Sequence, residues 1–222
     1  ITFNSINGKE FHIKVGYNNR QIRVIPNFIN SEIWKYNSEE RIKFRNEIGI
    51  KDNEILIGNI GRFDPQKDHK TFITSAQKVL DKYKNVKFII VGKNTHNLKI
   101  NSLFKEKFII LDYQKNVKKL YSGIDLVVLS SLYGEGFSNV ILEAMSMSIP
   151  CIASNVGDNA KIIDDNKLIF EAGNSADLTN KIIYFLNLDN NKKNDKKKYN
   201  KEIVRKHYES NNVLNEFKKI WI

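Results

Sequence analysis

Short apolar runs that alternate with helical patterns constrain the fold of this chain more than any other feature. The runs are rich in β-branched residues and lack polar alternation, as expected of strands that are buried on both faces. They lie at 23–25, 55–60, 88–91, 108–111, 126–129 and 151–153. Apolar residues at helical spacing lie between them, at 72–80 and 140–145. This alternation predicts an α/β fold with a doubly wound parallel sheet.

Two segments that combine glycine with charged residues each begin after one of these strands. Open α/β sheets bind ligands beyond the carboxyl ends of their strands, so we expect both segments at a ligand-binding edge. In the first segment, Gly61 is followed by Arg62 and, further on, by Lys67. The forked donors of arginine and the point charge of lysine together suit a diphosphate. An ordinary basic loop could contain the same residues, so the second segment decides between the two interpretations.

The second segment runs from Glu135 to Glu143, across a glycine turn and into an apolar helix. A helix N-terminus offers free N–H groups and a partial positive charge, which together form an anion site. We expect the N–H groups of Ser138, Asn139 and Val140 to face a phosphate. Glu143 would accept hydrogen bonds from ribose hydroxyls, or form a salt bridge at the helix surface instead. Glu135 would contact sugar hydroxyls, or only complement the helix dipole.

Together with Val24-Ile25-Pro26-Asn27, these segments resemble the retaining glycosyltransferases of the GT-B fold, in the large glycosyltransferase 4 group. Gly61–Lys67 is similar to the family's diphosphate-binding segment, and Glu135 with Glu143 is similar to its E-x7-E pair. The resemblance implies the Rossmann-like, C-terminal, donor-binding half of such an enzyme. It also implies that Glu143 binds the nucleotide ribose and that Glu135 contacts the donor sugar.

The resemblance supplies a full set of expected site residues. The catalytic residues would be Arg62, Lys67 and Glu135. The residues expected to bind the nucleotide-sugar donor are Gly61, Asp112, Tyr113, Gly136, Phe137, Ser138, Asn139, Val140 and Glu143. Among these, Asp112 and Tyr113 are the expected contacts of the base. The expected donor is a UDP- or GDP-sugar, with no cofactor and no metal, since the four histidines show no metal-ligand spacing.

Four positions depart from the family's usual pattern. Glycine is frequent in the family at the positions of Phe28, Asp68 and Ser148. Lys161 replaces a frequent glutamate after the turn at residues 155–157, and the sequence suggests no role for it. Asp68 and Ser148 flank the motifs, so they bear on the identity of the donor more than on the family.

The resemblance also divides the chain into three parts. Residues 1–18 would be a remnant of the last helix of an N-terminal domain, 19–202 the nucleotide-sugar-binding domain, and 203–222 a helix that crosses back. The Asn/Lys-rich stretch 189–201 is typical of a linker or a flexible surface segment. Because the acceptor half and a catalytic base would lie in the N-terminal domain, we expect a fragment that does not transfer sugar by itself.

The chain is strongly basic, with a formal net charge of +11, and much of this charge lies in residues 192–201. Such a surface attracts anionic lipid or an anionic substrate, although AT-rich codon usage would produce the same bias without a function. Few aromatics interrupt the basic run, which argues against nucleic acid as a partner. The expected partners are the nucleotide-sugar, a glycan or lipid-linked acceptor and an anionic membrane surface.

The cysteine count and the hydropathy pattern bear on location. Cys151 is the only cysteine, which excludes an internal disulfide and fits a reducing compartment. No apolar run approaches about 18 residues, and the first residues show no signal-peptide pattern. We therefore expect a cytoplasmic protein, peripheral on the inner face of the cell membrane if the basic segment binds lipid.

The leading hypothesis is a hexosyl- or N-acetylhexosaminyltransferase of polysaccharide or lipopolysaccharide biosynthesis, of which this chain is the donor-binding part. Two alternatives stay open at this stage. A sugar-nucleotide epimerase of the same fold would need catalytic carboxylates and a histidine that the sequence does not place. A non-enzymatic module would bind nucleic acid or another anion through the basic segment.

Overall fold

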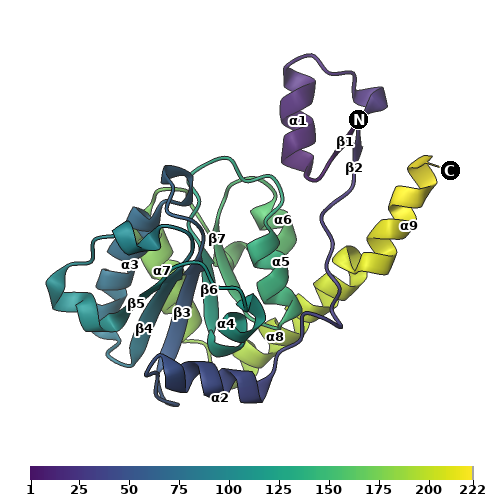
Figure 1. The fold of residues 1–222 in the computed structure, drawn as a ribbon. Coiled ribbons are helices and arrows are strands. Elements are labelled where there is room, and N and C mark those ends of the chain that lie inside the picture. The colour runs from purple at the N-terminus through teal and green to yellow at the C-terminus, as the bar shows by residue number, and fades with distance from the viewer. Residues whose placement is uncertain (222) are drawn as a thin grey trace.

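A six-stranded parallel sheet forms the centre of the protein (Figure 1). The computed structural model describes the backbone of residues 1–221 and the side chains of residues 1–219. The strands are β3 (Ile55–Ile60), β4 (Val86–Val91), β5 (Phe108–Leu111), β6 (Leu126–Leu129), β7 (Cys151–Ser154) and β8 (Ile169–Phe170). Their spatial order is β5-β4-β3-β6-β7-β8. The order reverses at β3, so the predicted doubly wound, Rossmann-like fold is confirmed.

Helices cover both faces of this sheet (Figure 1). They are α2 (Ser38–Glu47), α3 (His69–Lys82), α4 (Val117–Gly123), α5 (Asn139–Ser146), α6 (Asn159–Ile163), α7 (Ser175–Leu186) and α8 (Asn190–Ile203). Helix α9 (Ser210–Trp221) extends away from the sheet (Figure 1). Short 3₁₀ turns lie at Asn19–Gln21, Pro65–Lys67, Thr95–Asn97, Ser102–Lys107 and Asn166–Leu168. Helices α3 and α7 pack together on one face, and on the other face α2 packs on α4 and α8 on α5.

Five of the six predicted strands belong to this sheet. Residues such as Leu56, Ile57, Ile89, Val127 and Ile152 have 0% of their surface exposed, because helices cover the strands on both sides. Double-sided burial explains why the runs show no polar alternation. Strand β8 was not expected from the sequence, because its two residues are too few to form a recognisable run.

The sixth predicted strand, at 23–25, is present as β2 but lies outside the main sheet, so its expected place in that sheet was wrong. β2 (Arg23–Val24) pairs in parallel with β1 (Thr2–Phe3), and α1 (Ile6–Lys14) lies between them in the chain. A short β-branched run carries no information about its partner strand, which explains the error. We call residues 1–24 the N-terminal unit. It stands beyond the carboxyl edge of the main sheet (Figure 1).

The Asn/Lys-rich stretch 189–201 forms most of helix α8, so its prediction as a linker or a flexible surface segment was wrong. Asp189 caps the helix, since its Oδ1 accepts a hydrogen bond from the backbone N–H of Lys192 at 2.8 Å. Buried Asn200 anchors it through a hydrogen bond from Nδ2 to the carbonyl oxygen of Ile149 at 3.0 Å. A helix that is anchored by such hydrogen bonds needs few apolar residues. The polar composition of 189–201 therefore did not indicate a helix.

A π-helical turn, Val204–Tyr208, joins α8 to α9. Ile29 donates its N–H to the carbonyl oxygen of Tyr208 and accepts from the N–H of Ser210, both at 2.9 Å. Residues 25–34 therefore run beside the start of α9, and α9 leads toward the N-terminal unit (Figure 1). The predicted crossing helix at 203–222 comprises the end of α8, this turn and α9, and Ile222 lies outside the described residues.

Candidate functional site

Polar side chains join β3 to β6, the two strands at which the strand order reverses. Nδ2 of Asn59 donates to the carbonyl oxygen of Val128 and to Oγ of Ser130, each at 3.0 Å. Oγ of Ser130 in turn donates to the carbonyl oxygen of Lys67 at 2.8 Å. Asn59 and Ser130 are buried, and buried polar groups are costly unless they are paired. This paired network therefore holds the backbone of Lys67 at the carboxyl ends of the two strands.

The loop after β3 passes the backbone at Gly92 too closely for a Cβ atom there, and its own Gly61 lies in tight contact with the side chain of Lys67. A Cβ atom on Gly92 would lie 2.1 Å from the carbonyl oxygen of Gly61. A Cβ atom on Gly61 would lie 3.2 Å from Cγ of Lys67. The absence of a Cβ atom on Gly92 therefore lets the loops after β3 and β4 meet, and its absence on Gly61 leaves room for the side chain of Lys67.

Arg62 lies on the outer side of the same loop, with 56% of its side chain exposed. Its Nε donates to Oδ2 of Asp64 at 3.0 Å, and Nη2 donates to Oε1 of Gln66 at 3.2 Å. The hydrogen bond from the Gln66 N–H, followed by that from Arg62, lowers the pKa of Asp64. Asp68 has a φ of 43°, the left-handed region that favours glycine, and its Oδ1 caps α3 at the N–H of Thr71.

His69 supports this loop from within the protein. Its Nε2 lies 3.0 Å from the carbonyl oxygen of Arg62, and its ring stacks on Phe63 with centroids 6.4 Å apart. Burial lowers the pKa of His69, and the hydrogen bond with Arg62 offsets part of that effect. The neutral ring thus donates from Nε2 to the carbonyl oxygen of Arg62, and this hydrogen bond fixes the backbone of the loop at Arg62.

The loop after β6 brings Glu135 to Lys67. Nζ of Lys67 lies 2.5 Å from Oε1 of Glu135, and Oγ of Ser131 donates to the same oxygen at 2.6 Å. The two side chains of this ion pair are only 15% and 10% exposed. Gly157 packs beneath the loop, where a Cβ atom would lie 2.3 Å from the carbonyl oxygen of Glu135. The two predicted segments therefore meet at one point, although 68 residues separate the ion pair in sequence.

Helix α5 begins directly after this loop, with Ser138 as its N-cap. Phe137 is buried against Tyr208, with ring centroids 5.2 Å apart. Gly136 lies against the N-terminal unit, since a Cβ atom there would lie 3.1 Å from Oγ of Ser5. The backbone that we expected to face a phosphate therefore lies between the sheet edge and the N-terminal unit.

Glu143 lies in the second turn of α5 and is partly buried. The hydroxyl of Tyr121 donates to its Oε2 at 2.9 Å and lies 3.3 Å from the carbonyl oxygen of Val140. The ring of Tyr121 meets Trp34 edge to face, with centroids 5.9 Å apart. Burial raises the pKa of Glu143, and the hydrogen bond from Tyr121 offsets part of the rise. Within the described residues, Oε1 accepts no hydrogen bond and is available to a ligand.

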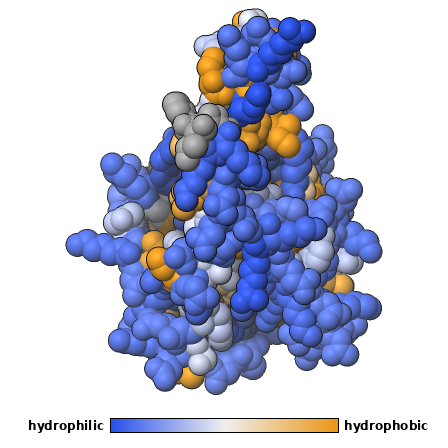
Figure 2. Space-filling view, turned by 90° about the vertical axis from the view of Figure 1, so that its right-hand side faces the viewer, coloured by the Kyte–Doolittle hydropathy of each residue, from blue (hydrophilic) through white to orange (hydrophobic). Residues whose placement is uncertain are grey.

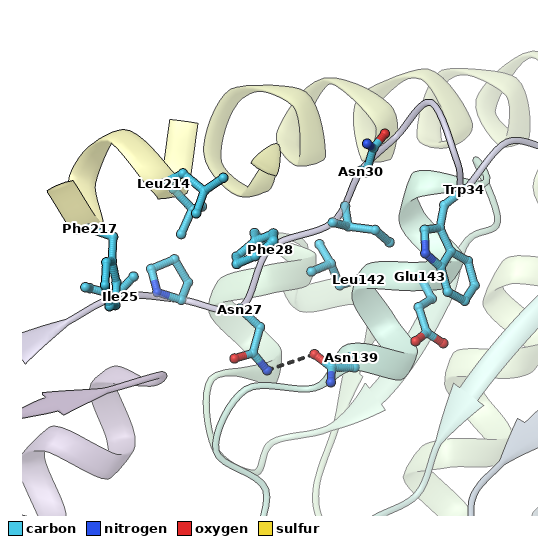
Figure 3. Close-up of a pocket in the computed structure, with 13 residues that line it drawn as sticks. Ile25, Asn27, Phe28, Asn30, Trp34, Asn139, Leu142, Glu143, Leu214 and Phe217 are labelled. Carbon is cyan, nitrogen blue, oxygen red and sulfur yellow. Dashed lines mark hydrogen bonds between the residues drawn. The ribbon is translucent and has the colours of Figure 1, made fainter. Parts of the chain in front are cut away.

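Glu143 lines a cavity of about 520 Å³ between α5, α9 and residues 25–34 (Figure 3). Figure 3 shows Glu143 and Trp34 at one end of this cavity, and Leu214 from α9 near the other. Nδ2 of Asn27 donates to Oδ1 of Asn139 at 2.8 Å, which ties the chain before α2 to the start of α5. The cavity therefore combines a polar end at the carboxylate with an apolar end at α9.

Asp112 and Tyr113 follow β5, at the outer end of the same sheet edge. Oδ1 of Asp112 accepts from the N–H groups of Tyr113 and Asn94 at 2.9 and 3.0 Å. Nδ1 of His96 lies 3.1 Å from Oδ2. The Tyr113 hydrogen bond, followed by that of Asn94, lowers the pKa of Asp112. Asp112 and Tyr113 thus form their hydrogen bonds within the loops after β4 and β5, and not with the Lys67–Glu135 ion pair.

Asp158 has a role that the sequence analysis missed. Its Oδ2 accepts a hydrogen bond from the N–H of Ile6 at 2.6 Å, and its Oδ1 accepts one from Asn7 at 2.9 Å. Its own N–H donates to the carbonyl oxygen of Gly136 at 2.9 Å. The side chain of Asp158 makes no capping hydrogen bond to its own helix α6, and it binds the first N–H groups of α1 after the N-cap Ser5 instead. Lys161 lies 3.8 Å from the same carboxylate.

Within the part of the chain that the structure describes, no three His, Cys, Asp or Glu side chains are grouped so that they could hold a metal. None of the helices in residues 1–221 combines the length and the apolar composition needed to cross a bilayer.

Residues 40–203 match the family described as glycosyl transferases group 1. An Escherichia coli protein, UDP-Gal:alpha-D-GlcNAc-diphosphoundecaprenol alpha-1,3-galactosyltransferase, is 30% identical over 165 residues, which cover 68% of this chain and 41% of that protein. The chain spans about two fifths of the length of the curated relatives that it matches.

Solved structures show the same fold. HepE of Anabaena in complex with UDP-glucose has a TM-score of 0.87 and 20% identity, over 99% of this chain and 62% of that one. The C-terminal domain of a group 1 glycosyl transferase from Francisella tularensis, LpcC, has a TM-score of 0.70 and 20% identity, over 82% of this chain and 99% of that domain. The fold is thus that of a Rossmann-like GT-B domain, and the chain belongs to the group 1 glycosyl transferases.

Proposed function

We propose that this chain is the donor-binding domain of a retaining glycosyltransferase. The whole enzyme would take a hexose or N-acetylhexosamine from a UDP- or GDP-sugar and pass it to a glycan or lipid-linked acceptor. The observation that carries the proposal is the ion pair between Lys67 and Glu135, which joins the two expected donor-binding segments where the strand order reverses. The names of the relatives support it, since one structure contains UDP-glucose and one enzyme uses UDP-Gal.

In this proposal, protein cations stabilise the diphosphate that leaves in the reaction. Lys67 supplies a point charge, and Arg62 supplies forked donors from the exposed side of the loop. The N-terminus of α5 adds backbone N–H groups around Ser138. Fixed donors of this kind stabilise developing charge without having to reorient during the reaction. No step of this proposal uses a metal ion or a cofactor.

The two glutamates have different roles in the proposal because their surroundings differ. Glu135 is held by Lys67 and Ser131 at the point where the donor sugar would follow the diphosphate. Glu143 keeps Oε1 available beside α5, where it would accept a hydrogen bond from a ribose hydroxyl. The base would extend toward Asp112 and Tyr113 at the outer end of the edge.

The acceptor and the catalytic base would lie in a further domain, so we propose that residues 1–222 bind the donor but do not transfer sugar. A role in polysaccharide or lipopolysaccharide assembly, in the cytoplasm at the inner membrane face, follows from the lipid-linked acceptor in this proposal. Membership of the transferase family favours transfer over the epimerase alternative.

Calorimetric titration with UDP, GDP and ADP, and with their glucose and N-acetylglucosamine conjugates, tests the proposal and identifies the base. We expect one nucleoside diphosphate to saturate a single site, and its sugar conjugate to bind at least as tightly. Addition of EDTA should leave the affinity unchanged. Failure of all three diphosphates to bind, with a folded protein, would contradict the proposal.

A further inference from the structure

A second cavity lies at the opposite edge of the sheet from the proposed donor site. It measures about 600 Å³, and its lining includes Ile124 and Asp125, directly before β6, and Ile149 and Pro150, directly before β7. The two strands thus present their amino ends to this cavity, whereas Ser130 and the donor segments follow carboxyl ends. A ligand in this cavity would occupy a site separate from the donor site.

Basic side chains converge on this cavity from two sides. Lys197 and Lys201 in α8 and Arg205 in the following turn are each four residues apart, so they project from one face of the helix. Lys35 and Arg41 line the cavity from the chain before α2 and from α2 itself. We call these five residues the basic cavity set. The face that bears α8 and α9 is largely hydrophilic (Figure 2).

Nearby carboxylates neutralise this set only in part. Asp125 pairs with Nη2 of Arg41 at 2.7 Å and with Nη1 of buried Arg45 at 3.1 Å, so two guanidinium groups share one carboxylate. Glu32 forms an ion pair with Lys35. Lys35 lowers the pKa of Glu32, and Arg205 and Lys201 lower it further, which is consistent with a positive potential on this face.

The three cations on the helix face are unpaired. Among the described residues, Lys197, Lys201 and Arg205 form no salt bridge. By contrast, Lys192 and Lys196 on the same helix have carboxylate partners. Like charges that gather without partners oppose one another, so a bound anion would remove this repulsion.

Hydroxyl groups complete the lining of the cavity. Ser31, Ser146 and Ser148 all border it. Ser148 has a φ of 61°, in the left-handed region where glycine is favoured, so this chain keeps a side chain there against its conformational preference. Its hydroxyl makes no hydrogen bond within the described residues and is therefore available to a ligand.

We propose that the basic cavity set binds a phosphate group, carried either by a soluble phosphorylated molecule or by an anionic phospholipid headgroup. Ammonium, guanidinium and hydroxyl donors are the groups that bind phosphate oxygens. The cavity has the volume of an ordinary small-molecule site. This site would give the basic segment a specific anion partner, and it does not depend on the donor site.

A pair of matched variants tests the proposal. The cavity variant carries Lys197→Gln, Lys201→Gln and Arg205→Gln. The control variant carries Lys192→Gln, Lys198→Gln and Lys206→Gln, which remove the same charge from the same segment but do not line the cavity. All six side chains are exposed, so both variants should fold, and melting curves check this.

Two probes distinguish the source of the phosphate. Inorganic pyrophosphate is titrated into each variant in a Lys67→Ala background, so that the proposed donor site contributes little. Separately, each variant is cosedimented with phosphatidylcholine vesicles, with and without phosphatidylglycerol. We expect the cavity variant to lose more than about tenfold in affinity for at least one probe, and the control variant to lose at most about threefold.

Each outcome bears directly on the site. Selective loss of pyrophosphate binding alone assigns the cavity to a soluble phosphate. Selective loss of binding to phosphatidylglycerol vesicles assigns it to a lipid headgroup. Equal losses in the two variants would mean diffuse attraction, and this result would overturn the proposal. Absence of binding of either probe to protein with native Lys197, Lys201 and Arg205 would overturn it as well.

Discussion

The ammonium group of Lys67 and the carboxylate of Glu135 lie 2.5 Å apart, and both are largely buried. This contact links the loop after β3 to the loop after β6 at the point where the strand order reverses. Removal of one member of a buried pair leaves an uncompensated charge, whereas removal of both does not. The pair therefore links the stability of this edge to its proposed chemistry, and the two can be separated by mutation.

Glu135→Gln should leave the affinity for free UDP unchanged or raise it by a few-fold. The substitution removes the carboxylate that now neutralises Lys67, so more of the lysine charge is available to a diphosphate. The additional affinity that the sugar contributes in the nucleotide-sugar should be lost. Calorimetry with UDP and with the preferred UDP-sugar checks both statements. A weaker affinity for free UDP would show that Glu135 binds the nucleotide itself.

Lys67→Ala should destabilise the fold by about 1–3 kcal/mol, since it leaves Glu135 in a largely buried site without its cation. Adding Glu135→Gln to this variant should recover most of that loss but should not restore UDP binding. Urea denaturation of the two single variants and the double variant gives the coupling between the residues. Lys78→Ala, on the exposed side of α3, is the control. Additive effects of the two substitutions would contradict the assigned pairing.

Glu143→Gln should stabilise the protein at neutral pH. The folded-state pKa of Glu143 is raised, chiefly by burial, so the folded protein binds a proton more tightly than the unfolded chain. Stability then falls as the pH rises through the window between the unfolded and folded pKa values. The glutamine variant lacks this loss, so its advantage in melting temperature should grow as the pH rises through that window. A constant difference across this range would contradict the raised pKa.

The same variant tests the proposed contact with ribose. Wild-type protein should prefer UDP to dUDP, and Glu143→Gln should reduce that preference, because an amide accepts weaker hydrogen bonds than a carboxylate. Paired titrations with the two nucleotides measure the ratio of affinities. An unchanged ratio would leave Glu143 as a structural partner of Tyr121 only.

Asp158→Ala should release the N-terminal unit from the sheet edge. The carboxylate accepts the N–H groups of Ile6 and Asn7, which an N-cap side chain would otherwise satisfy, so its loss should cost about 0.5–2 kcal/mol, the range for removal of an N-cap. Hydrogen exchange should then become faster at those two amides and stay unchanged in β3 and β4. Lys161→Ala, which changes a neighbour of the carboxylate at 3.8 Å, should have little effect. Unchanged exchange at Ile6 and Asn7 would contradict the assigned cap.

The parts of the fold whose signal is local are predictable from the sequence. Buried runs such as 55–60 and 126–129 predicted strands because both faces of the sheet are covered. The placement of the Lys67 and Glu135 segments at one edge of the sheet followed from a general rule about strand ends together with the family resemblance, whereas their ion pair was not predicted. The partner of the strand at 23–25 and the helical state of 189–201 depend on distant contacts, and composition does not contain them.

The polar residues that support the site were harder to identify. Asn59 and Ser131 carry no motif, and only their position at strand ends gives a signal. The partner of Asp158 is a helix more than 150 residues away in sequence, which no local pattern reveals. Site residues that belong to a motif are therefore predictable from the sequence. Residues that only position another side chain are not.

Titration of UDP and uridine into the wild-type chain and into an Arg62→Ala, Lys67→Ala variant tests the central claim most directly. Uridine lacks the diphosphate, so it measures the rest of the site alone. A hydrogen bond to a charged group contributes about 1.5–3 kcal/mol, so each substitution should weaken UDP by about 10- to 100-fold. We predict that the variant loses the preference for UDP over uridine while its uridine affinity stays the same. Retention of the full preference would contradict a diphosphate site at Arg62 and Lys67.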